Sequence, residues 1–272
     1  MPFRMHDVKI QLVGSSVGTA ATRQNLTTYV INDCVAIDAG CLGLMVPVSA
    51  QRSIRHVLLS HTHIDHLATL PLFLDNVFQS GEDCPQIHAS EDVWSCLTSD
   101  VFNERLWPDL SRVATAESSF YAPREIRSES TFEIAGLQIT PVSVDHVVPT
   151  LGFLIEDDCS AVVIASDTGP TERIWELASR MPFRNKLRAV FLECSFPDSH
   201  EWLARKTAHL CPRQFAAEIA KLKPGSSFLT VAVHLKAAMH DSVAAELHQL
   251  SLPEFCLGEE SRVWDFRDDP AG

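Results

Sequence analysis

Short apolar runs, each followed by polar or small residues, recur along most of the chain. Runs of roughly four to eight apolar or alternating residues that end in turn-forming residues are typical of strands buried on at least one face. Many of these runs are rich in valine and isoleucine, which favour extended backbone. The runs that we expect to form strands are 8–13, 26–31, 34–40, 57–59, 86–89, 132–134, 137–144, 151–156, 160–165, 188–192 and 227–233.

Apolar residues spaced three or four positions apart predict helices between these strands. Ser90, followed by acidic Glu91 and Asp92, is a favourable helix start. The helices that we expect run from about 65 to 79, from Ser90, from near Pro170, from about 212 to 222 and from 242 to 250. Strands that alternate with helices predict an α/β fold. Repeats, low-complexity tracts and linkers are not evident, so we expect one domain over residues 1–272.

The segment from Asp100 to Ser130 has the least regular pattern in the chain. It carries Phe102, Trp107, Phe120 and Tyr121 among charged residues and prolines. Aromatic residues in such a segment more often fill a local core than stack on nucleic-acid bases. We therefore expect these four to pack against a core, and a lid over a site is the alternative.

A dense group of metal-ligand side chains follows the apolar run 57–59. His61, His63, Asp65 and His66 lie within six positions of one another. Imidazole nitrogen and carboxylate oxygen are the atoms that zinc and similar divalent ions bind in proteins. In an extended loop, residues two apart point the same way, so His61 and His63 can bind one ion together. Asp65 and His66 open the next helix and can face a second ion.

Composition narrows the classes of partner. The formal net charge of −13 opposes tight binding to a phosphate backbone, which relies on Lys and Arg, so we expect no large nucleic acid as a partner. Residues 1–7 hold no apolar signal core and no run reaches membrane-spanning length, so we expect a cytoplasmic protein without a membrane contact. Eight cysteines, none in C-x-x-C spacing, are then expected to be reduced thiols.

The stretch His61-Thr62-His63-Ile64-Asp65-His66 resembles the HxHxDH signature of the metallo-β-lactamase superfamily. Ile64 stands where the signature usually has Leu, a change of little chemical consequence. The resemblance implies an α/β fold of four layers, an αββα sandwich. It also implies that further ligands stand at strand ends in a set order along the chain.

That order assigns roles to residues that are ambiguous by themselves. Without the resemblance, His146 would be interpreted as a surface residue at a strand end. Asp167 would be interpreted as a helix cap before Pro170, and Asp38 as a residue that supports a turn. Within the resemblance, Asp38 supports the metal loop from behind the ligands. The implied ligands are His61, His63 and His146 for one ion, Asp65, His66 and His234 for the other, and Asp167 as the bridge between both.

The implied centre has a definite chemistry. Three imidazoles leave the first ion a position for water, as catalytic sites require. A second ion within roughly 4 Å makes the pair a clamp for the attacking and leaving oxygens. Water that bridges two cations should ionise near neutral pH and act as the nucleophile. We expect two divalent ions, zinc first and manganese as the alternative, and we count Asp65 among the catalytic residues as well as the ligands.

Shorter stretches resemble one branch of the superfamily, the class II cyclic nucleotide phosphodiesterases. Residues 193–196 and 208–212 are similar to the E-x-S-F and G-H-L-T-P stretches of that family. Residues 102–108 resemble its segment with Asn and Trp-Pro, and His234-Leu235-Lys236 matches its His-x-Lys pattern. These motifs are scattered between about residues 8 and 236.

The second stretch departs from the family at two positions, where Ala208 and Cys211 replace Gly and Thr. His209 lies between them. The plain interpretation of His209 is a residue at a helix start, and the resemblance implies that it gives a proton or hydrogen bond to the leaving 3′ oxygen. Glu193 and Lys236 are expected beside the ligands or the substrate, with Lys236 stabilising charge on the phosphoryl oxygens.

The predicted function is hydrolysis of a small nucleotide, a nucleoside 3′,5′-cyclic phosphate such as cyclic AMP or cyclic GMP, to the 5′-monophosphate. Cleavage of RNA, as in tRNA 3′-processing nucleases, is one alternative, and the acidic composition counts against it. Acyl hydrolysis, as in glyoxalase II and lactonases, is another and would not need His209. A metal-binding module without activity ranks last, and the sequence leaves a homodimer open.

Overall fold

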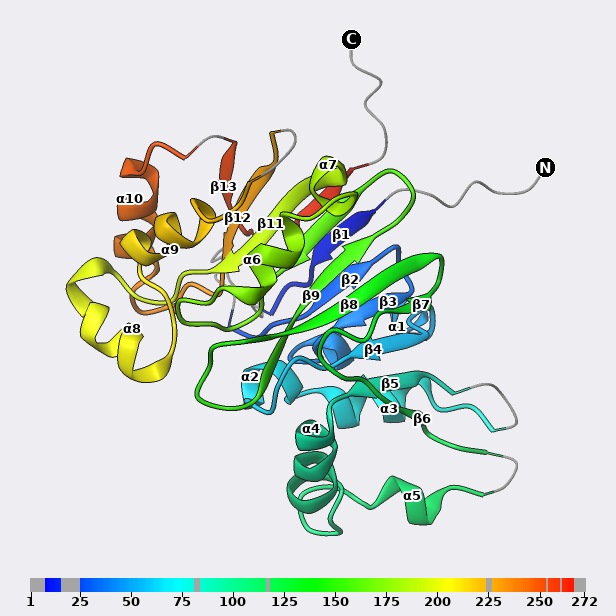
Figure 1. Ribbon diagram of the computed structural model, residues 1–272. Helices are drawn as coiled ribbons and strands as arrows, with labels where there is room; N and C mark the ends of the chain where they lie inside the picture. Colours follow the sequence, from blue (N-terminus) through cyan, green and yellow to red (C-terminus); the bar gives the residue numbers. More distant parts are fainter. Residues whose placement is uncertain are drawn as a thin grey trace.

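Two seven-stranded sheets lie face to face in the computed structural model, which describes residues 8–15, 25–80, 84–115, 118–223, 227–252, 254–259 and 261–266. The first sheet has the order β14 (Val263–Asp265), β1 (Lys9–Leu12), β2 (Tyr29–Ile31), β3 (Val35–Ile37), β4 (His56–Leu58), β5 (Gln86–Ala89) and β6 (Ala122–Glu125). The second has the order β13 (Phe255–Leu257), β12 (Leu229–Val233), β11 (Leu187–Glu193), β10 (Ala161–Ile164), β9 (Thr150–Glu156), β8 (Leu137–Val144) and β7 (Phe132–Ile134). Figure 1 shows the second sheet lying over the first.

Helices cover the outer face of each sheet. On the first sheet these are α1 (Val48–Arg52), α2 (Ile64–Leu67), α3 (Leu70–Val77), α4 (Glu91–Cys96) and α5 (Leu110–Val113), with the short turns η1 (Leu42–Leu44) and η2 (Leu97–Val101). On the second they are α6 (Arg173–Ala178), α7 (Phe183–Lys186), α9 (Pro212–Ile219) and α10 (His240–Gln249), while η3 (Asp198–His200) and α8 (Glu201–Thr207) stand to one side (Figure 1).

Three apolar layers result from this stacking. One lies between the sheets and contains Ile10, Leu58 and Phe153. The others lie under the helices, with Phe73 in the layer of the first sheet and Trp175 in that of the second. The predicted α/β fold, a four-layer αββα sandwich, is confirmed.

The strand directions place the polar strand ends together. Strands β3, β4 and β5 are parallel neighbours, and so are β10, β11 and β12. β8 is antiparallel to β9, which is antiparallel to β10, so β8 runs in the same direction as β10. The carboxyl ends of these strands therefore meet at one edge of the sandwich, where ligands usually bind in such sheets.

Two predictions about the first sheet were wrong in part. The helix expected to run to about residue 79 breaks into α2 and α3 at Thr69, whose amide donates to the carbonyl of Ala39 and whose hydroxyl accepts from Gly43. Pro71 also lacks the N–H that a continuous helix needs. The segment 100–130 holds α5 and the strand β6, which pairs in parallel with β5.

The aromatic residues of that segment do fill a local core. Phe102 is buried, and Trp107, Phe120 and Tyr121 pack against the apolar layer under the first sheet. Several other predicted elements differ from the observed bounds by a few residues, among them β2, which begins at Tyr29, and α9, which ends at Ile219.

Within the described residues, no helix is both long enough and apolar enough to cross a bilayer. All eight cysteines are free thiols, and those at positions 41, 194 and 211 are buried.

Candidate metal centre

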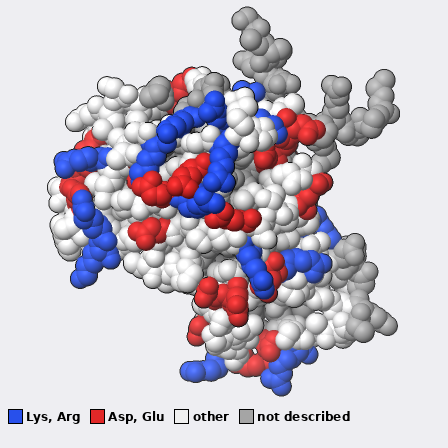
Figure 2. Space-filling view, viewed as in Figure 1, with Lys and Arg blue, Asp and Glu red and all other residues white. Residues whose placement is uncertain are grey.

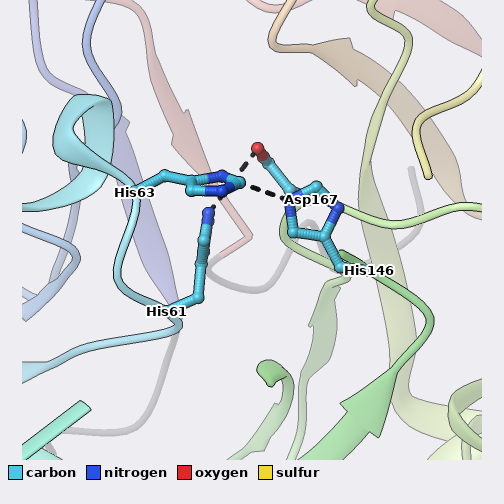
Figure 3. A group of neighbouring side chains, drawn as sticks. All are labelled: His61, His63, His146 and Asp167. Atoms are coloured by element: carbon cyan, nitrogen blue, oxygen red, sulfur yellow. Dashed lines mark hydrogen bonds and ion pairs between the residues drawn. The ribbon is translucent and has the colours of Figure 1, made fainter. Parts of the chain in front are cut away.

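Two groups of potential ligands meet at the shared edge. His61, His63, His146 and Asp167 form the first group, and their potential ligand atoms lie within 4.8 Å of one another. Figure 3 shows these four side chains converging from separate segments. Asp65, His66 and His234 form the second group. All seven ligands expected from the sequence are therefore close together.

Asp167 lies between the two groups. Its Oδ2 atom is 3.8 Å from His61 Nε2 and 3.4 Å from His234 Nε2, and its Oδ1 atom is 3.3 Å from His66 Nε2. The carboxylate of Asp167 thus lies near imidazoles of both groups, so it can bind an ion in each group at once. This is the position that a bridging ligand requires.

Left-handed backbone turns the chain at several of these strand ends. Asp38, Ser166 and His234 have φ of 61°, 59° and 58°, and Ala208 has φ of 49°. Residues other than glycine rarely adopt this conformation, which costs about 1–3 kcal/mol each and is concentrated at functional sites. The fold therefore accepts backbone strain where Asp38 and His234 enter the site and where the Ala208 carbonyl meets His146.

Gly40 permits the closest approach in this region. A Cβ atom at this position would lie 2.0 Å from the carbonyl oxygen of Asp65 and 2.7 Å from the amide nitrogen of Thr27. Thr27 N–H in turn donates to that same Asp65 carbonyl. Only glycine lets the turn after β3 pack against the backbone of the second ligand group.

Asp38 holds two of the imidazoles from behind. Its carboxylate accepts hydrogen bonds from the amide and the hydroxyl of Ser60, both at 2.8 Å, and lies 2.6 Å from His66 Nδ1. The Ser60 hydroxyl is also 2.9 Å from His61 Nδ1. Such outer contacts fix the ring orientation, so that Nε2 of both rings faces the centre.

The second sheet holds two further imidazoles in the same way. His146 Nδ1 lies 2.9 Å from the carbonyl oxygen of Ala208, and His234 Nδ1 lies 3.0 Å from the hydroxyl of Ser195. The Nε2 atoms of both rings are left for the centre. His146 Nε2 is 3.2 Å from His63 Nδ1, so these rings face each other across the first group.

The donor atoms fit divalent cations. Nε2 of His61 and of His66 are buried and make no hydrogen bond, although an unpaired buried polar atom costs about 1–3 kcal/mol. Coordination of a cation by these nitrogens would remove that cost. The set consists of imidazoles and carboxylates without sulfur, which suits zinc, manganese and similar ions.

The electrostatic environment also favours ligation. Burial lowers the pKa of His61 to about 2 and lowers the pKa of His63 and His146, so these imidazoles are neutral, as ligands must be. Burial opposes ionisation of Asp167, but nearby His234 and His66 outweigh it and hold its pKa well below the usual range.

His66 differs from the other imidazoles. Burial opposes its protonation, but the carboxylates of Asp167 and Asp38 outweigh this effect and raise its pKa. Burial also raises the pKa of Asp65, but a hydrogen bond from His234 and the charge of His66 lower it more. Positive charge is thus favoured between these carboxylates, and a bound cation can supply it in place of the His66 proton.

Glu193 and His209 form a buried pair beside the centre. Glu193 Oε1 accepts hydrogen bonds from His209 Nδ1 and from the Thr168 amide, and Oε2 accepts from the Ser195 hydroxyl at 2.9 Å and the Leu210 amide at 3.3 Å. His209 also lies within 4.8 Å of ligand atoms of Asp167 and His234. Burial opposes its protonation, but Glu193 outweighs burial and raises its pKa.

Lys236 borders the other side of the centre. Its Nζ atom is 3.6 Å from Asp65 Oδ2, and its side chain is 38% exposed. A small cavity of about 110 Å³ lies between Asn25, Asp65, His234 and Lys236. The ammonium group can therefore reach an anionic ligand that sits next to the second group.

The structure brings together every predicted site residue but also shows contributors that we did not predict. Ser60 and Ser195 link the ligands to Asp38 and Glu193, and Gly40 makes room for Asp65. Ser60 directly precedes the motif at residues 61–66 and Ser195 lies inside the stretch 193–196, which is the signal that could have identified them. The side chain of Asn103, in the segment with Trp-Pro, accepts hydrogen bonds from the Arg105 and Leu106 amides of its own loop.

Comparison with known proteins gives one family match. The sequence pattern of a family described as "Beta-lactamase superfamily domain" matches residues 33–234 of the chain, a span that holds all seven predicted ligands. This is most of the chain.

Two relatives match this chain at the same identity. A 3′,5′-cyclic-nucleotide phosphodiesterase of Schizosaccharomyces pombe is 26% identical over 191 residues, which cover 64% of this chain and 53% of that enzyme. A ribonuclease Z of Kineococcus radiotolerans is 26% identical over 220 residues, which cover 65% of this chain and 66% of that enzyme. The chain spans less than two thirds of either relative.

Among solved structures, that of unliganded yeast PDE1 superimposes with a TM-score of 0.78. The superposition covers 95% of this chain and 99% of the yeast chain, at 15% sequence identity. At this identity the likeness shows a shared fold.

Proposed function

Because this chain belongs to the β-lactamase superfamily, we propose that it is a metal-dependent phosphodiesterase that hydrolyses nucleoside 3′,5′-cyclic phosphates to 5′-monophosphates. The observation that carries the proposal is the Glu193–His209 pair beside the ligand groups. The likeness to a cyclic-nucleotide phosphodiesterase supports the choice of substrate.

The two ligand groups would hold one divalent cation each. His61, His63 and His146 face the first, Asp65, His66 and His234 face the second, and Asp167 is shared. The cations, when bound, supply an activated water and neutralise charge on the phosphoryl oxygens. Zinc is the metal we favour for this set of imidazoles and carboxylates.

The chemistry of the leaving group explains why a proton donor such as His209 is needed. The 3′ oxygen of a ribose leaves as a strongly basic alkoxide unless it receives a proton as the bond to phosphorus breaks. Glu193 binds His209 Nδ1 and leaves the opposite nitrogen, Nε2, free to give a proton to that oxygen. A thioester, whose thiolate leaves more readily, has less need of such a donor.

Lys236 and the outer carboxylate Asp38 have supporting roles. The Lys236 ammonium, beside the cavity at Asp65, would bind a phosphoryl oxygen and stabilise its charge. Asp38 orients His66 and, through Ser60, His61. Neither residue needs to contact the leaving oxygen.

Cleavage of RNA 3′ ends is the second candidate. It is favoured by the ribonuclease Z relative, which matches this chain at the same identity as the phosphodiesterase. The same centre and the same His209 could serve a strand as well as a ring, because both reactions break a bond from phosphorus to a 3′ oxygen.

A substrate panel on zinc-loaded protein tests the proposal. It should contain cyclic AMP, cyclic GMP, a precursor tRNA, bis(p-nitrophenyl) phosphate, a thioester and a lactone. We expect fastest turnover of a cyclic nucleotide and a loss of about 100-fold or more with His209→Ala. Intact cyclic nucleotides beside rapid cleavage of any other member of the panel would reject the proposal.

A further inference from the structure

A groove of about 590 Å³ opens directly beside the metal centre. One wall is the segment 143–151, which carries His146, and the other walls are residues 90–92 at the start of α4 and residues 125–128 after β6. Figure 2 shows Asp and Glu side chains over the end of α4 that faces the body of the molecule. A substrate whose phosphate lies at His146 would extend into this groove.

The groove offers hydrogen-bond acceptors rather than cations. Glu91, Asp92, Glu125 and Asp145 line it, and Arg127 is its one guanidinium group. Arg127 Nε lies 2.7 Å from Glu125 Oε1, so the one guanidinium group is paired with one of the four carboxylates. Glu91 and Asp92 are exposed, so their carboxylates can accept hydrogen bonds from a ligand in the groove.

The groove also has an apolar part and suitable dimensions. Val147 is 55% exposed on the segment next to His146. The amide of Leu151, at the far end of this wall, donates a hydrogen bond to the carbonyl of Ser60. This bond holds the segment 143–151 against the loop that carries His61. A volume of this size fits a small molecule, since ligand pockets are typically about 300–1,000 Å³.

We infer that this groove binds the nucleoside part of the substrate and that Glu91 and Asp92 accept hydrogen bonds from the amino group of its base. The inference rests on the proposed phosphodiesterase function. Carboxylates pair with amino groups such as N4 of cytosine, and adenine and guanine carry amino groups as well. Uracil has none, so cyclic UMP is the poorest substrate of the four.

The same carboxylates disfavour a polynucleotide. Each additional nucleotide of a strand brings another phosphate, and a phosphate in this groove would meet four carboxylates and a single guanidinium group, that of Arg127, which already pairs with Glu125. Two like charges about 4 Å apart repel even in water. The groove thus selects a substrate with one phosphate, a mononucleotide rather than an RNA 3′ end.

The test compares kcat and KM of the wild type and a Glu91→Ala/Asp92→Ala double variant for cyclic AMP, GMP, CMP and UMP. In the wild type we expect kcat/KM for the three amino-bearing nucleotides to exceed that for cyclic UMP on the order of tenfold, as one good contact to a base edge gives. In the double variant the ratio falls to about one through a higher KM, with kcat retained.

Two controls separate this effect from damage to the centre. Bis(p-nitrophenyl) phosphate has no nucleoside, so its turnover should be equal in wild type and double variant. Asp75→Ala removes an exposed helical carboxylate outside the groove and should leave all ratios unchanged. A wild type that ignores the base, or a variant that keeps the preference, overturns the groove inference alone. A wild type inactive on every cyclic nucleotide overturns the proposed function.

Discussion

Replacing Glu193 by glutamine keeps the size of a buried side chain and removes its charge. In the wild type, each carboxylate oxygen of Glu193 accepts a hydrogen bond from one backbone amide. The Thr168 amide donates to Oε1 at 3.1 Å, and the Leu210 amide donates to Oε2 at 3.3 Å. Whichever way the amide of glutamine turns, its NH₂ group faces one of these N–H donors. One buried donor then loses its partner, and the bond to His209 loses the help of a charge.

The structural cost follows from these contacts. An unsatisfied buried donor costs about 1–3 kcal/mol, and loss of the charge-assisted bonds adds about 1 kcal/mol, so the free energy of unfolding should fall by about 2–4 kcal/mol. Glu193 does not belong to either ligand group, so the metal content should stay at the wild-type value. Urea denaturation and metal analysis check these two expectations.

The catalytic effect should depend on the leaving group. With cyclic AMP, whose 3′ oxygen needs a proton, kcat should fall by about 100-fold, the usual contribution of a general acid. With bis(p-nitrophenyl) phosphate, whose phenolate leaves without a proton, kcat should fall by less than about fivefold. Equal losses on both substrates, or loss of metal, would refute the reasoning that Glu193 acts through His209.

Three further predictions concern the framework of the site. Ala208→Gly should raise the free energy of unfolding by about 1 kcal/mol and Tm by about 2–4 °C, because φ of 49° suits glycine; calorimetry that shows a lower Tm would contradict this. Gly40→Ala should lower Tm and the metal content, since the new Cβ collides with the Asp65 carbonyl; unchanged metal analysis would contradict it. Burial, His56 and Arg124 lower the pKa of His88 to about 4, so its contribution to stability is full above pH 6.5 and is lost as the pH falls toward 4. His88→Gln should therefore flatten the fall in unfolding free energy between pH 6.5 and 4 by at most about 3 kcal/mol, and parallel urea titration curves for variant and wild type would contradict this.

The proposed ligands could be predicted because several of them stand shortly after an apolar strand. His61 follows β4, Asp167 follows β10 and His234 follows β12, and parallel strands put such ends at one edge. The fold class followed from the alternation of strands and helices and from the resemblance. Assignment of Asp167 as the bridge needed the resemblance, since its position before Pro170 also suits a helix cap.

Contacts between distant segments account for what the sequence did not show. The break at Thr69 depends on hydrogen bonds to Ala39 and Gly43, which no local pattern contains. Strand β6 is Ala-Pro-Arg-Glu, a polar sequence that is held extended by pairing with β5. Its place at the edge of the sheet tolerates the proline. Ser195 gains its role from contacts with Glu193 and His234 in the folded chain.

The central claim is that the ligand groups hold two cations joined by Asp167. The most direct test is the number of zinc ions per chain, with X-ray absorption at the zinc edge, in wild type and Asp167→Ala. We predict two ions per chain with only nitrogen and oxygen neighbours in the wild type, and at least one ion lost in the variant. One ion or none in the wild type, or zinc bound to sulfur, would contradict the account.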